Sequence, residues 1–448
     1  MALALAALAV LLGPLHGVWE SVGYGLIWSF EGAGLATFEV TTTTCVVSTR
    51  YRFEAPADPG VRAGYRAENN IGAVANDWII RTGSTPSRLV AHVPGTLSDV
   101  EFRSVRAVPT RCTPPTPADR GSLFEIYQRT VAEHYAFFAE RRMDWPATVA
   151  AARAGRGAAT SDTAFYQLLQ GMVAPLQDAH TKVIAPTLGL NYPTYRRTEQ
   201  WIEGDLLARL RDLAPIGYLR DSLVRFDGGR LQVGWLRDSI GYLKVTALYN
   251  FTQSGRFEDD SIALAGRLDQ VLGILSHARG LVLDLRINGG GYDGLARMLA
   301  GRLTGQPYPA LVKRARSDPR DQRRLTRAAA VGVVPGRGPR YLGPLVVLTG
   351  IRTVSAGEVL TLMLLARRPR PTLIGQPTQG VFADELVRRL PNGWQFQLSS
   401  ERYTTPAGRT FEGPGIPPDI AAPVFPADER DGRKDTALEK ALASLGRH

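Results

Sequence analysis

The sequence predicts a multidomain protein in which an N-terminal all-β domain and a helical segment precede an α/β core. Three observations support this. Short alternating runs separated by turn residues fill positions 18–112, a helical repeat of aromatic residues begins near position 121, and apolar strands alternate with helices after position 240. At 448 residues, 44% of them hydrophobic, the chain is long enough for two or three domains with large cores.

Residues 18–112 carry the pattern of a small β domain. Runs such as 36–40 (ATFEV) and 45–48 (CVVS) are separated by turn residues at regular intervals, which predicts a small sandwich or a partial barrel. Cys45 and Cys112 are the only cysteines and lie near the two ends of this region. The sequence is compatible with a disulfide between them and also with two separate buried thiols. The Pro-rich residues 113–120 are interpreted as a linker.

A helical cap with a connecting segment is expected over residues 121–239. Apolar residues recur there at steps of three and four, which predicts a helix with one largely aromatic face: Phe124, Tyr127, Val131, Tyr135 and Phe138. His134 lies beside this face and is interpreted as a structural histidine. Ser161 or Asp162 is suited to cap a second helix.

Residues 240–425 are expected to form the α/β core. Strands are predicted over 240–245, 280–285, 345–349 and 372–375, and helices over 264–275, 294–303 and 359–366. This succession predicts a mostly parallel sheet with helices on both faces. Asn392 and Gly393 predict a tight hairpin turn, and the tail 426–448 is expected to contain a short helix over 435–445.

The first 17 residues resemble the apolar region of a secretory signal, although the usual positive n-region is missing. A buried helix or strand that opens the first domain is the alternative. The signal interpretation leads us to expect an extracytoplasmic protein, either secreted or periplasmic. The stretch is too short to span a bilayer and no later segment qualifies, so no integral membrane segment is expected.

The net charge of +11 does not by itself indicate a nucleic-acid partner. Only five of the 53 basic residues are lysines, which is typical of codon bias, and no zinc-finger, RNA-binding or basic-heptad motif is present. The dense basic run over residues 313–327 is interpreted as a solvated loop. We therefore expect no nucleic acid as a partner.

The residues most suggestive of chemistry are 353–358 (TVSAGE), which follow the apolar run 345–350 and lead into an apolar helix. A serine between a buried strand and a helix presents its hydroxyl at the sheet edge, where N–H groups at the helix start face a developing oxyanion. The alternative is that Ser355 is an ordinary helix cap.

Four stretches, in this order, resemble the S41 family of serine peptidases: 284–291 (DLRINGGG), 353–358 (TVSAGE), 373–380 (LIGQPTQG) and 412–419 (EGPGIPPD). The family includes the C-terminal processing (tail-specific) proteases, the tricorn core protease and retinoid-binding modules. The resemblance implies a core of the ClpP/crotonase-like type and cleavage of polypeptide substrates through an acyl-enzyme. It implies that Ser355 is the nucleophile and that N–H groups near Gly290 and Ala356 form the oxyanion hole.

The resemblance also indicates which base would assist Ser355. One branch of the family uses a lysine about two dozen residues after the serine, but Val381 stands at that position here and no lysine occurs between Lys313 and Lys434. The tricorn-like branch uses serine, histidine and glutamate. His180, in 176–181 (LQDAHT), matches its histidine, and Glu412 matches its glutamate. Glu401 is a competing carboxylate for the third position.

Further expectations concern substrate recognition, an alternative function, cofactors and assembly. Many members of the family insert a PDZ domain, but residues 181–239 are short for one, which leaves recognition of a free C-terminus open. An inactive ligand-binding module on the same fold is the alternative function. No cofactor or metal is expected, because the glycines at 289–291 lack a nucleotide-binding spacing and no metal-ligand spacing occurs. The oligomeric state stays open.

Overall fold

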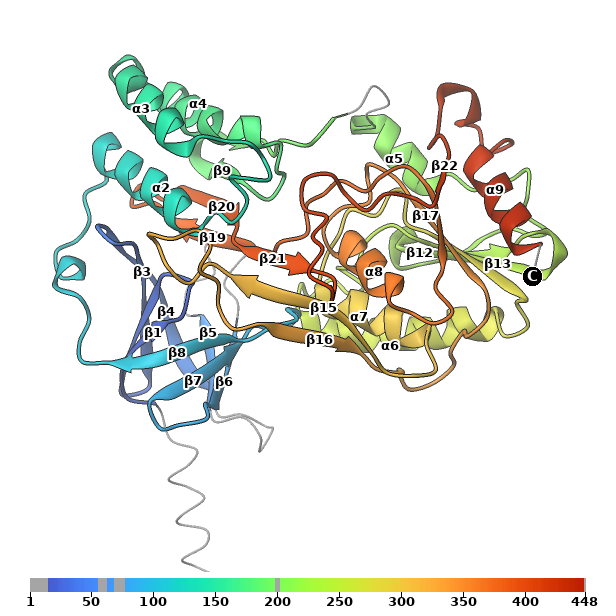
Figure 1. Ribbon diagram of the computed structural model, residues 1–448, viewed down its shortest axis with the longest axis horizontal. Helices are drawn as coiled ribbons and strands as arrows, with labels where there is room; N and C mark the ends of the chain where they lie inside the picture. Colours follow the sequence, from blue (N-terminus) through green and yellow to red (C-terminus); the bar gives the residue numbers. More distant parts are fainter. Residues whose placement is uncertain (1–14, 55–62, 68–76, 198–201, 447–448) are drawn as a thin grey trace, which may run out of the picture. The chain divides into compact units, whose positions relative to one another are not determined.

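The computed structural model describes residues 15–54, 63–67, 77–197 and 202–446 of the chain (Figure 1). The expected signal segment lies almost wholly outside these residues. The described residues belong to two compact units. The first comprises residues 1–195, 314–329 and 383–402, and the second comprises residues 196–313, 330–382 and 403–448. Each unit combines segments that are far apart in the chain, so the units do not test the domain boundaries expected from the sequence.

The N-terminal part of the first unit is a closed antiparallel barrel, which confirms the expected all-β domain and decides for a full barrel over a sandwich or partial barrel. Each strand pairs with its sequence neighbours, and β1 closes the ring against β8. The strands are β1 (Gly17–Ser21), β2 (Leu26–Glu31), β3 (Gly34–Val40), β4 (Cys45–Glu54), β5 (Ala63–Ala67), β6 (Trp78–Thr82), β7 (Arg88–His92) and β8 (Val100–Val105).

Large apolar side chains fill the barrel, since alternate residues of each strand point inward. Trp28 stacks on Phe102, with ring centroids 3.9 Å apart. A disulfide joins Cys45 at the start of β4 to Cys112, which follows the last strand. The question that the sequence left open between a disulfide and two thiols is therefore answered in favour of the disulfide.

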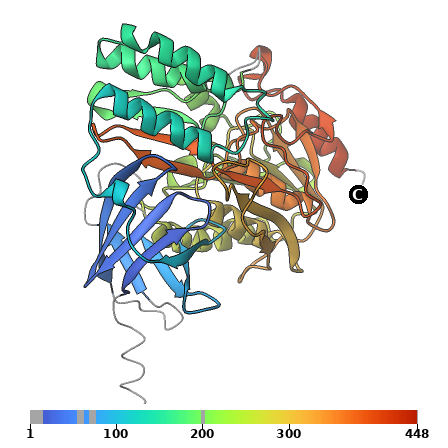
Figure 2. The ribbon, with the colours of Figure 1, turned by 60° about the vertical axis from the view of Figure 1, so that its left-hand side comes forward.

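Three helices and a four-stranded sheet of the first unit share one hydrophobic core (Figure 2). The helices are α2 (Arg120–His134), α3 (Trp145–Gly155) and α4 (Asp162–Val173). The sheet has the order β10-β9-β20-β19 and contains β9 (Lys182–Ala185), β10 (Leu190–Asn191), β19 (Glu385–Arg389) and β20 (Gln395–Ser399). The Ser161 side chain caps α4 by accepting the Ala164 N–H at 3.1 Å, as expected. Helix α2 ends at His134, so Phe138 joins the same core from outside the helix.

The second unit contains a seven-stranded sheet in the order β11-β12-β13-β14-β17-β18-β22, and it confirms the expected α/β core. The pairs from β13 to β22 are parallel, whereas β11, β12 and β13 pair antiparallel. The strands are β11 (Val224–Phe226), β12 (Leu231–Trp235), β13 (Ile240–Val245), β14 (Gly280–Asp284), β17 (Leu345–Thr349), β18 (Thr372–Gly375) and β22 (Ile420–Ala421). The three central strands β13, β14 and β17 are buried along their whole length, as parallel strands covered on both faces require.

Helices cover both faces of this sheet, as expected (Figure 1). They are α5 (Gly204–Asp212), α6 (Phe257–Ile274), α7 (Asp293–Arg302), α8 (Ala356–Leu365) and α9 (Thr436–Leu445). Tyr242, Val282 and Val346 share a core with α9 on one face. Gly241 points the other way, and a Cβ there would lie 3.0 Å from Leu275 at the end of α6. A further sheet has the order β16-β15-β21 and contains β15 (Tyr308–Ala315), β16 (Ala329–Val333) and β21 (Glu401–Thr404).

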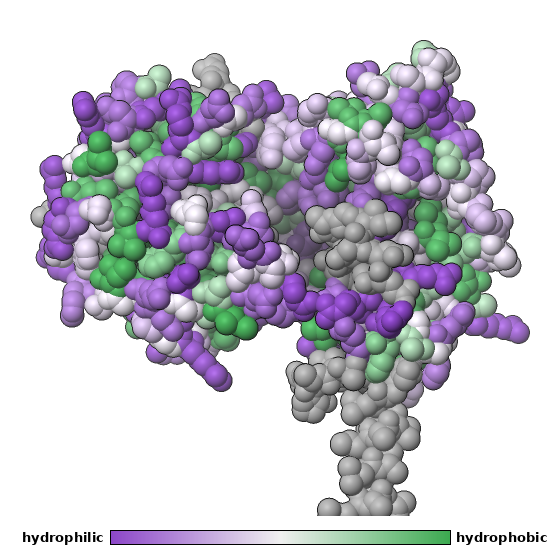
Figure 3. Space-filling model, turned by 180° about the vertical axis from the view of Figure 1, so that it is seen from behind, coloured by the Kyte–Doolittle hydropathy of each residue, from purple (hydrophilic) through white to green (hydrophobic). Residues whose placement is uncertain are grey.

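Some large hydrophobic side chains of the described residues are exposed, among them Tyr192, Ile262 and Val334. Figure 3 shows hydrophilic side chains spread between small hydrophobic areas on the face drawn there. Single exposed apolar residues such as Ile262 are ordinary on a folded protein. Among the described residues, no helix combines the length and the apolar character needed to cross a membrane.

Candidate active site

Ser355 lies at the turn between β17 and α8, where the sequence analysis expected it. Its backbone has a φ of 55° and a ψ of −125°, a conformation that residues with a Cβ rarely adopt. Such strain persists only where the surrounding structure fixes it, and it concentrates at functional sites. The Ser355 N–H donates to the Val381 carbonyl at 3.1 Å, which holds this turn against residues 380–382.

The glycine loop after β14 approaches the Ser355 side chain within the second unit. A Cβ at position 290 would lie 2.7 Å from the Ser355 Cβ, so only glycine fits there. Ala356 is the first residue of α8, and its N–H has no acceptor within its own helix. The structure therefore brings together Ser355, Gly290 and Ala356.

Asn288 fixes this glycine loop, although the sequence analysis gave it no role. Its side-chain amide donates to the Val245 carbonyl at 2.9 Å, and its Oδ1 accepts the Gly290 N–H at 2.9 Å. The Gly290 N–H is thus engaged in the described state. To serve an oxyanion, it would have to share or release the Asn288 oxygen.

Glu358, one turn into α8, is a second buried residue that the sequence analysis missed. Its carboxylate accepts the N–H groups of Gly380 at 2.7 Å, of Val381 at 2.8 Å and of Ser355 at 3.3 Å. Burial raises the pKa of Glu358 to about 7, against the lowering effect of these hydrogen bonds. The only sequence signal for a role of Glu358 was its position three residues after Ser355. Ordinary helix caps have the same spacing, so this signal does not single it out.

Glu412, the expected third member of the triad, is buried in the second unit. Its Oε2 accepts the N–H of Phe382 at 3.0 Å. The following residue of the chain, Ala383, belongs to the first unit. The competing Glu401 also lies in the first unit, where it accepts the hydroxyl of Tyr24 at 2.5 Å.

His180 lies in the first unit, in the loop between α4 and β9. Its Nδ1 is 2.6 Å from the carbonyl oxygen of Ala383. Since a carbonyl only accepts, this contact places the hydrogen of a neutral ring on Nδ1 and leaves Nε2 as the basic nitrogen. His180 and Ser355 belong to different units, so their pairing stays a prediction.

Asp178 shapes the loop that carries His180. Its carboxylate accepts the His180 N–H at 3.0 Å, the Thr181 hydroxyl at 2.9 Å and the Ser399 hydroxyl at 3.2 Å. Burial by itself would raise the pKa of Asp178, but the nearby guanidinium charge of Arg141 and the hydrogen bonds from Ser399 and Thr181 hold the pKa below its usual value. The carboxylate is therefore a stable anchor for the loop.

The described part of the chain gathers no group of three or more histidine, cysteine or acidic side chains suited to a metal ion. What the second unit presents is a serine on a strained strand-to-helix turn of a largely parallel sheet, with a glycine backbone against it. This arrangement defines a serine hydrolase type of domain. The sequence profile of peptidase family S41 matches residues 239–422, so this part of the chain is a domain of the S41 peptidase type.

Similar proteins agree with this family. Carboxyl-terminal-processing peptidase 1, chloroplastic, of Arabidopsis thaliana is 28% identical over 206 residues, which cover 46% of this chain and 36% of that protein. Peptidase 2 of the same name and organism is 26% identical over 240 residues, which cover 51% of this chain and 40% of the relative. The chain thus spans well under half the length of these two relatives.

Two solved structures share the fold. A protein of Parabacteroides merdae ATCC 43184 aligns with a TM-score of 0.58 and 23% identity, covering 73% of this chain and 97% of its own. Mature CPAF, solved in complex with lactacystin, aligns with a TM-score of 0.53 and 13% identity, covering 72% of this chain and 96% of its own. At these identities the likeness concerns the fold.

Proposed function

We propose that the protein is a serine endopeptidase that cleaves polypeptides through an acyl-enzyme on Ser355. The observation that carries this proposal is the φ of 55° at Ser355, beside a glycine that no other residue could replace. The Ser355 oxygen forms a bond to the scissile carbonyl carbon while His180 Nε2 takes the hydroxyl proton. His180 then gives this proton to the leaving amine as the peptide bond breaks. A water molecule then attacks the ester carbonyl of the acyl-enzyme while His180 takes its proton. The Ser355 oxygen leaves and receives this proton from His180.

The oxyanion and the imidazolium each need a partner in this reaction. The N–H groups of Ala356 and Gly290 would donate to the oxyanion, with Gly290 turning from Asn288 toward it. Glu412 would stabilise the charged His180. Its hydrogen bond to the Phe382 N–H supports this role, because the next residue in the chain, Ala383, supplies the carbonyl that holds His180.

Labelling by a fluorophosphonate probe tests this proposal. We expect the full chain to be labelled, and Ser355→Ala to lose both labelling and casein cleavage. His180→Ala should lose nearly as much, because the two groups act as a unit. Ser276→Ala, at an exposed serine of the same unit, is the matched control and should keep both. Labelling that persists in Ser355→Ala would overturn the proposal, and a wild-type chain without labelling would favour the ligand-binding module.

Two finer features are also proposed. Export is supported by the Cys45–Cys112 disulfide, since disulfides persist in oxidising compartments. Recovery of the mature chain only from the cytoplasmic fraction would contradict export.

Processing of substrates at a free C-terminus is suggested by the names of the two Arabidopsis relatives. Equal cleavage of a peptide and of its C-terminally amidated form would rule this specificity out.

A further inference from the structure

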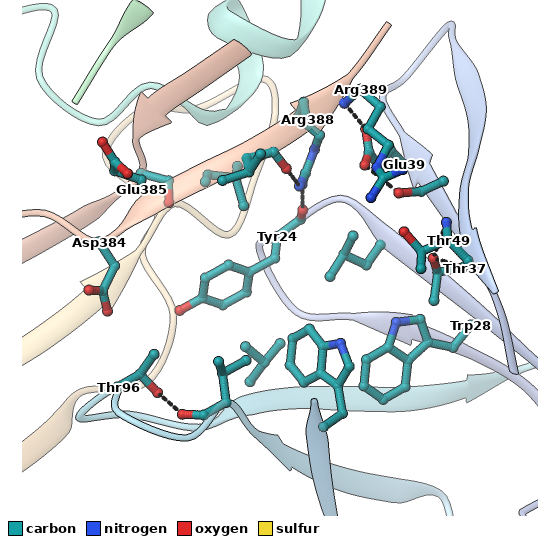
Figure 4. A pocket seen from close by; sticks show the side chains of 18 of the residues that line it. Tyr24, Trp28, Thr37, Glu39, Thr49, Thr96, Asp384, Glu385, Arg388 and Arg389 are labelled. Atoms are coloured by element: carbon teal, nitrogen blue, oxygen red, sulfur yellow. Dashed lines mark hydrogen bonds between the residues drawn. The ribbon is translucent and has the colours of Figure 1, made fainter. Parts of the chain in front are cut away.

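Charged side chains that the proposed reaction does not use line a cavity of about 180 Å³ at one end of the barrel (Figure 4). The Glu39 carboxylate there accepts the Ser48 hydroxyl at 2.6 Å and the Arg389 N–H at 2.9 Å. The Arg388 guanidinium donates to the Tyr24 carbonyl. These groups are held by the wall of the cavity, which accounts for their charges without a ligand.

Arg211, in the second unit, is in a different situation. It lies in the last turn of α5, and its side chain is exposed. Its guanidinium forms no hydrogen bond or ion pair with any residue that the structure describes. A basic residue is ordinary at the end of a helix, where it complements the helix dipole. The place of the guanidinium therefore has to show whether it has a further role.

The end of α5 is held against the α/β core. Lys244 donates to the Leu210 carbonyl at 2.8 Å, and the Gln232 amide donates to the Arg211 carbonyl at 2.8 Å. Leu210 also shares a small hydrophobic core with Ile287, which follows β14. The backbone of Arg211 thus has a fixed place beside the glycine loop at 289–291.

The Arg211 guanidinium flanks this glycine loop. A Cβ built at position 289 would lie 3.8 Å from Arg211 Nη2, and no other described atom outside the chain neighbours comes within 4 Å of it. Gly289 is exposed, whereas the next residue, Gly290, is buried against Ser355. The guanidinium therefore lies beside an exposed stretch of backbone next to the nucleophile.

The contacts of the loop limit the distance between Arg211 and Ser355. Because consecutive Cα atoms are about 3.8 Å apart, Arg211 Nη2 lies within about 13 Å of the Ser355 Cβ. An extended chain advances about 3.3–3.6 Å per residue. A substrate group bound by Arg211 would thus be at most about four residues from the carbonyl that Ser355 attacks.

Arg230 supplies a second positive charge near the loop. Its Nε donates to the Tyr249 carbonyl at 2.7 Å, and its guanidinium carbon lies 5.7 Å from the centre of the Tyr249 ring. The preceding residue, Leu248, donates its N–H to the Gly290 carbonyl at 2.8 Å. Arg230 is therefore tied to the segment that packs along the glycine loop.

Two acidic side chains of the same region are directed elsewhere. The Asp227 carboxylate is paired with Arg267 at 3.1 Å. Asp212 follows Arg211 in the chain, but its Oδ1 lies 3.4 Å from a Cβ built at Gly229. The positive charge of Arg211 is thus left for an anionic group from outside the chain.

We propose that Arg211 determines the cleavage specificity by binding a carboxylate of the polypeptide substrate, an inference that rests on the proposed function. A guanidinium binds a carboxylate through two parallel N–H···O bonds. The carboxylate belongs to the free C-terminus of the substrate or to an aspartate or glutamate side chain. In either case it fixes the register of the bound chain, so that cleavage falls within about four residues of it.

Cleavage of matched peptides tests the role of Arg211. The probes are fluorescein-labelled octapeptides of alanine and leucine: one with a free C-terminus, one with an amidated C-terminus, and one amidated with a single internal glutamate. For the wild type, at least one carboxylate peptide should have a KM about tenfold or more below that of the amidated peptide. The peptide with this advantage identifies the source of the carboxylate, and mass spectrometry of the products locates the cut.

Three variants show whether Arg211 causes this advantage. Arg211→Gln should remove it by raising KM with kcat nearly unchanged, and should leave the amidated peptide unaffected. Arg211→Lys should keep part of it, since lysine keeps the charge without the two parallel bonds. Arg209→Gln is the matched control, because Arg209 is also exposed in the last turn of α5 but faces another side of the helix. It should behave as the wild type.

An Arg211→Gln variant that cleaves all three peptides like the wild type, or that weakens all three alike, would overturn the role of Arg211. Binding to the Ser355→Ala protein separates this result from the proposed reaction. Fluorescence polarisation should show the preferred carboxylate peptide bound about tenfold more tightly than the amidated peptide, and this difference should vanish in Ser355→Ala/Arg211→Gln. Equal binding of the three peptides, or no binding, would overturn the proposal whatever the result of fluorophosphonate labelling. Carboxylate-dependent binding without labelling of the wild type would overturn only the proposed reaction.

Discussion

Ser355 combines a reactive hydroxyl with an unfavourable backbone, and two inactive variants can separate these properties. Both Ser355→Ala and Ser355→Gly remove the hydroxyl, but only glycine accepts a φ of 55° with a ψ of −125° at little cost. We expect Ser355→Gly to be more stable than Ser355→Ala by about 1–2 kcal/mol in urea unfolding. Equal stabilities would show that the turn carries no strain.

The buried carboxyl of Glu358 gives a pH dependence of known sign. Its pKa is about 7 in the folded chain against the ordinary 4.5, so the folded state holds the proton more tightly. Stability from this group is fully present below the unfolded pKa and is lost as pH rises through 7, by about 3 kcal/mol.

Glu358→Gln should remove this pH dependence, although the amide cannot accept all three N–H groups and lowers stability overall. The wild-type advantage over the variant should shrink between about pH 5 and about pH 8. The measurement is the free energy of urea unfolding at each pH. An advantage that stays constant over this range would contradict the raised pKa.

At the scale of elements, one buried contact anchors α9 to the central sheet. Asp435 caps the helix by accepting the Leu438 N–H at 3.0 Å and binds the Arg286 guanidinium at 2.9 and 2.8 Å. Asp435→Ala should therefore lose about 3 kcal/mol of unfolding free energy, and Asp435→Asn less, because asparagine still caps the helix. Asp428→Ala, at an exposed carboxylate, is the control and should change stability by less than about 0.5 kcal/mol.

The strands and helices of the α/β core show which element bounds a sequence pattern predicts correctly. Strands β13, β17 and β18 have the predicted bounds, because a short apolar run buried on both faces has sharp ends. Helix α6 begins at Phe257 instead of residue 264, and α8 begins at Ala356 instead of residue 359. Their first turns are rich in acidic or small residues, which a search for apolar periodicity passes over.

At the scale of the whole chain, the disulfide links residues 67 positions apart. It joins β4 to the segment that follows the barrel, so its loss frees a long loop in the unfolded chain. We expect a reductant to lower the unfolding free energy of the barrel, followed by tryptophan fluorescence, by about 2–4 kcal/mol. The double variant Cys45→Ser/Cys112→Ser should be equally destabilised and insensitive to reductant. A barrel that reductant leaves unchanged would contradict this.

The sequence by itself determined the order of β, helical and α/β segments and the position of Ser355 between a strand and a helix, because these follow from local periodicity. Gly290 was singled out by the resemblance to family S41 and not by the local pattern. Closure of the barrel, the disulfide, and the burial of Asn288 and Glu358 beside Ser355 were decided only by the tertiary structure. They depend on pairings between residues far apart in the chain, and local patterns carry no information about such pairings.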